Sequence, residues 1–239
     1  MRLFAALLLF FLALIPVGAD SFLDNVNWAT RGSILFFAND NGKQNADPAP
    51  ILPSLGFAAE WQFYGPLRLE LTEDIYFTNY EYNSALGYAM PCNPENRSAF
   101  VLGFITGLQL AGFFPVGKNG AGVRVYGGPS ADLRVVVQAF GLHPDDAEDA
   151  SAQTKNISNY FWSEGRWFYP VLGAGIDFPV NEGFLLGFDL RAWFPVYRLW
   201  TDQNLPAIDG WRFGVGLRIT PRKKSAPPKA DEPKTGSGE

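Results

Sequence analysis

The sequence predicts an all-β protein, an eight-stranded antiparallel up-and-down transmembrane β-barrel. Three observations lead to this prediction. Long segments alternate apolar with polar residues, the joins between these segments alternate in length, and the polar faces carry arginines and acids but no lysine. All three observations are typical of β-strands. Helical periodicity, by contrast, is weak throughout the chain.

The alternation is clearest at residues 67–80, which read LRLELTEDIYFTNY. Leu67, Leu69 and Leu71 fall on one face of an extended strand, whereas Arg68 and Glu70 fall on the other, because successive side chains leave a strand on opposite sides. A soluble sheet buries its leucines, but a membrane barrel turns them toward lipid and its charges inward. One strand does not distinguish the two arrangements.

Several strand-like segments exceed the five or six residues usual in soluble proteins. Their lengths suit a tilted membrane strand, which needs about 9–11 residues to cross the bilayer. The segments cover residues 27–38, 52–64, 67–79, 98–114, 122–138, 163–178, 184–199 and 210–220.

The joins between the segments follow a short–long order. Short joins lie at 65–66, 115–122 and 179–183, and long polar joins lie at 39–50, 80–97, 140–160 and 201–210. In an antiparallel barrel this order places the tight turns and both termini at one rim and the long loops at the other. Bacterial outer-membrane barrels have short periplasmic turns and longer extracellular loops.

The polar faces contain six acids and seven arginines, which we predict to form an ion-pair network in the lumen. Arginine is favoured where multi-donor pairing takes place away from bulk water. Eight strands enclose an interior that side chains can just fill. The predicted lumen residues are Arg31, Glu60, Arg68, Glu70, Asp74, Arg124, Asp132, Arg134, Asp177, Asp189, Arg191, Arg212 and Arg218.

Two residues do not fit the pattern. Glu73 has the parity of the lipid face, where a charge at mid-membrane would be costly. Either a bulge near residues 72–74 or a position close to the interface would resolve this conflict. Pro129 lies inside a predicted strand and indicates a local break in the ladder, since proline has no N–H to donate.

The two ends of the chain predict export and a flexible tail. Arg2 and an apolar run from Leu3 to Ile15 match a signal peptide, with cleavage after Ala19. The expected division is a signal peptide at 1–19, a barrel at 20–220 and a disordered periplasmic tail at 221–239, which is rich in proline, lysine and serine.

Other functional classes find little support. The net charge of −5 argues against nucleic-acid binding, and the single cysteine, Cys92, excludes an intramolecular disulfide. His143 lies in an acidic loop without a serine or aspartate arranged as a catalytic partner, so we expect no enzyme. We interpret the acids of that loop, Asp145, Asp146, Glu148 and Asp149, as solvated rather than metal-binding, and we expect no cofactor. A soluble lipocalin-like barrel or a two-sheet sandwich would not explain the strand lengths and the paired lumen charges.

Residues 27–220 resemble the small eight-stranded outer-membrane barrels typified by the OmpA transmembrane domain, OmpX and OmpW. The resemblance rests on the alternating strands and the loop asymmetry, and it implies a bacterial outer-membrane location with periplasmic termini. It further implies contact with outer-membrane lipid, lipopolysaccharide or its equivalent, and with the assembly machinery, although the last strand (WRFGVGLRIT) has no terminal aromatic residue. A plugged scaffold whose loops meet an external ligand is expected. The alternative is a narrow OmpW-like channel for ions or small apolar solutes.

Overall fold

The computed structural model describes residues 26–38, 51–84, 87–92, 98–117, 120–139, 150–201 and 210–222. The expected signal peptide, and the expected tail beyond Arg222, lie outside these residues. The strands are β1 (Val26–Phe37), β2 (Ile51–Tyr64), β3 (Leu67–Asn83), β4 (Tyr88–Cys92), β5 (Ala99–Val116), β6 (Ala121–Gly128), β7 (Ser130–Ala139), β8 (Val171–Pro179), β9 (Phe184–Trp193) and β10 (Arg212–Pro221). The helical elements are α3 (Ala150–Trp162) and the 3₁₀ turns η1 (Ser163–Gly165) and η2 (Val196–Leu199).

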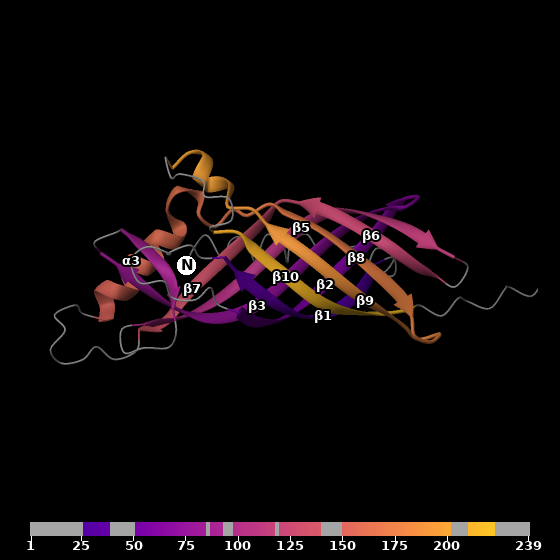
Figure 1. Ribbon diagram of the computed structural model, residues 1–239, viewed down its shortest axis with the longest axis horizontal. Coiled ribbons are helices and arrows are strands. Elements are labelled where there is room, and N and C mark those ends of the chain that lie inside the picture. The colour runs from indigo at the N-terminus through magenta and orange to yellow at the C-terminus, as the bar shows by residue number, and fades with distance from the viewer. Residues whose placement is uncertain are drawn as a thin grey trace, which may run out of the picture.

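The strands close into an antiparallel ring, which confirms the predicted fold class. The order around the ring is β1, β2, β3, β5, β6, β8, β9 and β10, and β10 pairs again with β1. Paired residues traced from Leu110 in the two directions around the ring arrive at Val26 and at Phe36 of β1, a stagger of ten residues. The strands are therefore tilted, as a closed barrel requires and as Figure 1 shows.

Side-chain exposure follows the alternation along each strand. Outward residues such as Leu55 (74% exposed) and Leu190 (62%) leave large apolar surfaces uncovered, whereas inward residues such as Leu35 (0%) are fully buried. A soluble protein rarely exposes a continuous apolar surface of this size. The exterior has instead the composition of a lipid-facing belt.

Pro129 interrupts the wall where the sequence predicts a break. β6 ends at Gly128 and β7 begins at Ser130, although the pairing with β5 keeps the same register on both sides of the interruption. The backbone N–H of Leu108 donates to the carbonyl of Pro129 at 3.0 Å. The reciprocal bond is missing because proline lacks an N–H.

The wall is lower on one side than the alternation predicts. The segments expected as strands at 163–178 and 184–199 reach only Val171–Pro179 and Phe184–Trp193, with η1 and η2 outside the strands. Pro170 and Pro195 lie where strand pairing stops, and a proline in the ladder removes a donor. On the opposite side β3 extends to Asn83 and forms a hairpin with β4, inside the expected loop 80–97.

A helix occupies part of the loop expected at 140–160. α3 packs against β3, β4 and β7, and Ile157 (0% exposed) and Phe161 (1%) join a buried cluster with Tyr80 and Val101. We call this unit, made of α3, β4 and the adjoining ends of β3, β5 and β7, the loop-rim assembly. It lies at the left end of Figure 1. The turns at 65–66 and 180–183 and the join between β5 and β6 mark the opposite turn rim.

Among the described residues, no helix is both long and apolar enough to cross a membrane.

Candidate functional site: the charged lumen

The structure places all the predicted lumen residues on the inner face of the barrel. Their side chains are at most 9% exposed, apart from Arg68 at 19% near the turn rim. Strand parity explains this placement, because each residue is an even number of positions from its inward neighbours on the same strand. The residues do not form a single cluster, however, and divide into two sets.

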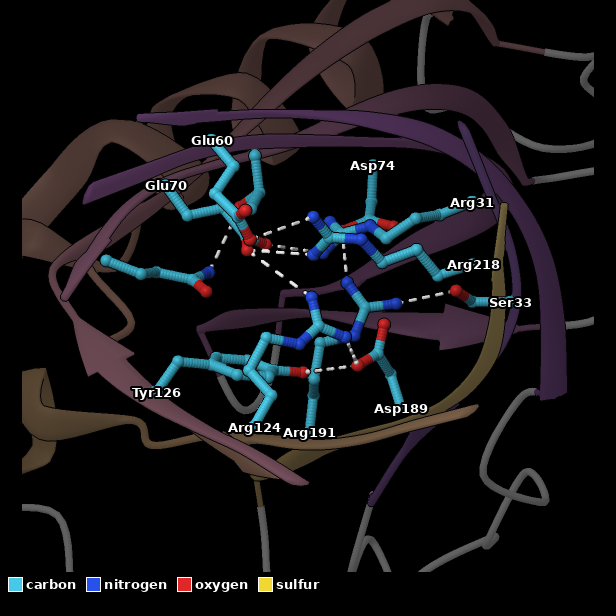
Figure 2. A network of polar contacts seen from close by, with 12 residues as sticks. Arg31, Ser33, Glu60, Glu70, Asp74, Arg124, Tyr126, Asp189, Arg191 and Arg218 are labelled. Atoms are coloured by element: carbon cyan, nitrogen blue, oxygen red, sulfur yellow. Dashed lines mark hydrogen bonds and ion pairs between the residues drawn. The ribbon is translucent and has the colours of Figure 1, made fainter. Parts of the chain in front are cut away.

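Glu70 lies at the centre of the larger set, which we call the turn-rim network. Its carboxylate is 0% exposed and lies 2.8 Å from Arg218 Nη1, 3.4 Å from Arg124 Nη1 and 3.8 Å from Arg31 Nη1. These arginines come from β10, β6 and β1. One acid on β3 thus connects strands on several sides of the ring, and Figure 2 shows the side chains converging from the wall.

Two further acids extend the turn-rim network toward the middle of the barrel. Asp74 accepts a hydrogen bond from Arg31 Nη2 at 2.6 Å and a second one from Arg191. Arg191 also donates to Ser33 Oγ at 2.6 Å. Asp189 accepts from Arg124 Nη2 at 2.5 Å. These contacts appear as dashed lines in Figure 2.

The turn-rim end of the network contains Glu60, Arg68 and Asp177. Glu60 lies 2.6 Å from Arg68 Nη1 and 3.3 Å from Arg218 Nη2, and Asp177 lies 3.7 Å from Arg124 Nη2. The turn-rim network therefore contains five arginines and five acids, and its formal charge is zero. Balance of this kind matters because an unpaired buried charge is strongly destabilising.

Asp132 organises the second set, the loop-rim cluster. It accepts hydrogen bonds from Tyr76 Oη at 2.8 Å and from Arg212, and it forms an ion pair with Arg134 Nε at 2.9 Å. Two guanidinium groups share one carboxylate, so the loop-rim cluster carries one excess positive charge.

Aromatic rings surround the loop-rim cluster. Arg212 lies 4.0 Å from the ring centroid of Tyr169 and 4.4 Å from that of Phe37, and Arg134 lies 4.0 Å from that of Phe161. The negative faces of aromatic rings attract cations, most strongly where water is excluded. These rings therefore offset part of the charge that Asp132 leaves uncompensated.

Glycines on the inner face make room for two large phenols. A Cβ atom at Gly103 would overlap the ring of Tyr76, and one at Gly173 would overlap the ring of Tyr126. Tyr76 is fully buried and hydrogen-bonded to Asp132. These two glycines thus have a packing role, because the barrel has room for only some large side chains at each level.

Several solved structures of outer-membrane or surface proteins align with this chain. The structure of Neisserial surface protein A aligns with 12% identity over 82% of this chain and 96% of that chain, at a TM-score of 0.44. Ail, the attachment invasion locus protein of Yersinia pestis, aligns with 9% identity over 82% of this chain and 95% of that chain, at a TM-score of 0.43. The outer-membrane protein AlkL aligns with 11% identity over 82% of this chain and 87% of that chain, at a TM-score of 0.34. No protein-family model and no curated protein matches the sequence.

The closed ring, its apolar exterior and its charged interior are together decisive. The architecture is that of the small eight-stranded outer-membrane β-barrels. Within this barrel the outward Trp28, Trp61 and Tyr64 lie toward the turn rim, and Trp167 and Trp200 lie toward the loop rim. Aromatic residues at two levels are typical of the two interfaces of a membrane.

The remaining chemical candidates lie mostly outside the described residues, including His143 and the acidic loop 145–149. Among the residues that the structure describes, no cluster of three or more histidine, cysteine or acidic side chains is arranged to hold a metal ion. Cys92 is half-buried at the end of β4 and is not part of a disulfide among the described residues. What the described site offers is a set of buried, mutually paired charges.

Proposed function

We propose that this protein is an integral outer-membrane protein whose barrel is a closed anchor for the loop-rim assembly. The observation that carries the proposal is the turn-rim network, whose ten charged side chains point into the lumen and pair across it. Buried pairs of this kind hold a structure in place only while their partners are present. Such a lumen suits a scaffold better than a pore.

The energetic cost of opening supports the closed state. Ions could cross only if several pairs separated together, since Glu70 alone contacts arginines from three strands. Removing one partner of a buried pair costs about 3–5 kcal/mol. Separation of several pairs would therefore be rare at equilibrium. The narrow-channel alternative would require a rearranged network.

The loop-rim assembly is the part of the chain that we propose to meet an external partner. It has its own buried cluster, in which Phe161 packs edge-on against Tyr80 at 4.8 Å between ring centroids. Burial raises the pKa of Tyr160 on α3 to about 12, although the nearby Arg166 opposes this shift. An ordered unit of this kind can hold a binding surface in a fixed position above the barrel.

Lipid contact is the second part of the proposal. The apolar belt would lie against the acyl chains of the outer membrane, and the two aromatic levels would lie near the headgroups, lipopolysaccharide or its equivalent included. Insertion would depend on the outer-membrane assembly machinery. Its recognition signal would lie within β10, whose last residues are Ile219, Thr220 and Pro221.

Thiol labelling on intact cells tests the orientation. In a Cys92→Ser background, Asn159→Cys on α3 and Glu182→Cys in the turn after β8 provide exposed reporters at opposite rims. A membrane-impermeant maleimide should label Asn159→Cys on intact cells, and Glu182→Cys only after the outer membrane is permeabilised. The reverse pattern would refute the proposed topology, and equal labelling of both reporters on intact cells would refute the membrane location.

A further inference from the structure

Glu73 lies on the lipid-facing side of β3, near the middle of the apolar belt. Outward residues of this strand are apolar on both sides of it, from Leu67 to Leu71 and from Ile75 to Phe77. The pairing of β3 with β2 and β5 runs through Glu73 without a shift, to Phe57 and Thr106. The bulge that the sequence suggested is therefore absent, and the carboxyl group stays on the outer face.

A hydrogen bond on the outer face holds this carboxyl group. Thr106 Oγ1, on the neighbouring strand β5, donates to Glu73 Oε2 at 2.5 Å. Paired residues continue the same outer row, with Phe57 on one side and Ala131 on the other. The row thus presents an acceptor, a hydroxyl and a small methyl group in the middle of an apolar surface.

This arrangement leaves the carboxyl group incompletely satisfied in lipid. A carboxyl group can form several hydrogen bonds, and hydrocarbon supplies none, so polar groups at mid-membrane are costly. No cation of the described chain is placed to pair with it on the belt. The described arginines lie in the lumen or at the rims, and the described lysine, Lys155, lies on α3.

We propose that the row around Glu73 and Thr106 is the contact surface for a second copy of this chain within the membrane. A two-fold interface brings the same patch of both copies together, so residue i of one meets residue j of the other. Thr106 donates its one hydroxyl proton to Glu73 Oε2. A neutral carboxyl group, the form favoured in hydrocarbon, still has its own O–H to donate, and the oxygen atoms of Glu73 and Thr106 can accept, so the patch is complementary to itself. Small residues such as Ala131 permit close approach, which favours association in lipid.

The complementarity also explains why a second copy suits the site better than lipid. Acyl chains would cover Phe57 and Ile75, which are 42% and 39% exposed, but they would leave the carboxyl group without further partners. In the dimer each copy supplies the other with a polar partner at the same depth. The apolar side chains around the polar pair then exclude lipid from it.

Energy transfer between labelled copies in lipid vesicles tests the dimer. Copies carrying Asn159→Cys in the Cys92→Ser background would be labelled with donor or acceptor and reconstituted at increasing dilution in lipid. We expect transfer above the level of random encounters, and about tenfold or more weaker association for Glu73→Leu, since two symmetric polar contacts are lost. Glu73→Gln, which keeps hydrogen-bonding capacity, should stay within about threefold of the parent.

Leu190→Ala provides the matched control, because Leu190 is an outward residue of β9 on the far side of the ring. It should leave association unchanged. Folding of every variant is checked by the heat-dependent shift in gel mobility, and Glu73→Leu should fold because it removes a polar group from the belt. The proposal would be overturned if energy transfer between copies of the parent stayed at the level of random encounters at all dilutions. It would also be overturned if Glu73→Leu associated as strongly as the parent. Either result would assign the site to lipid or to another membrane protein.

Discussion

Asp132 supplies the carboxylate of the loop-rim cluster, so its loss should destabilise the barrel. It is 0% exposed as a side chain and binds two arginines and the phenol of Tyr76. Asp132→Ala would leave Arg134 and Arg212 as buried cations without a carboxylate. Breaking one buried ion pair costs about 3–5 kcal/mol, and the nearby aromatic rings recover about 1–2 kcal/mol at best. We expect a net loss of about 2–3 kcal/mol in the free energy of unfolding.

Urea titration in detergent micelles or bilayers measures this loss, provided that unfolding and refolding curves coincide. Glu164→Ala is the control, because Glu164 also pairs with an arginine, Arg166, but its side chain is 53% exposed. Pairs with an exposed partner contribute about 0–1 kcal/mol, and Arg166 keeps its hydrogen bond to Ser163 Oγ and its contact with the ring of Tyr160, so the control should unfold close to the parent. A loss below about 1 kcal/mol for Asp132→Ala would refute the view that the loop-rim cluster depends on this carboxylate.

Three further substitutions test other parts of the account. Arg191→Ala removes a partner of the turn-rim network and should lower the free energy of unfolding by about 3 kcal/mol; an unchanged urea midpoint would contradict the network. Gly173→Ala forces a methyl group against Tyr126 and should cost about 1–3 kcal/mol in the same titration, whereas Gly32→Ala, whose Cβ meets open space, should not destabilise. Phe161→Ala should release α3 from the strands at a local cost of about 3 kcal/mol or more. Hydrogen exchange should then become faster over residues 150–162, while the barrel strands stay protected. Exchange unchanged from the parent would show that this side chain does not hold the helix.

Strand parity and connection lengths were enough to predict the ring and its two faces. Because a strand has a period of two, Glu70 and Asp74 could be assigned to the lumen without knowing any neighbour. Which arginine binds which acid could not be predicted. Pairing depends on the height of each residue after eight strands are staggered by the barrel's shear, which is why Asp132 forms a separate cluster.

The loop-rim assembly illustrates a different limit. The sequence of α3 is mostly polar. Its docking depends on Ile157 and Phe161, which are spaced i and i+4. These two residues contact Tyr80 of β3 and Val101 of β5, which are far from α3 in the sequence. Helices gain most of their stability from such tertiary packing rather than from intrinsic propensity. By contrast, the sequence does contain a signal for the shortening of β8 and β9 at the loop rim. Pro170 precedes β8 and Pro195 follows β9, and a proline interrupts the pairing of strands.

Conductance of the refolded mature barrel in planar bilayers tests the central claim most directly. Insertion is first established by the heat-dependent gel shift. A lumen filled by the paired charges around Glu70 and Asp74 should be electrically silent, and Arg191→Ala should introduce at most brief openings. Steady single-channel currents from the unaltered protein would contradict the closed lumen and establish a narrow channel instead.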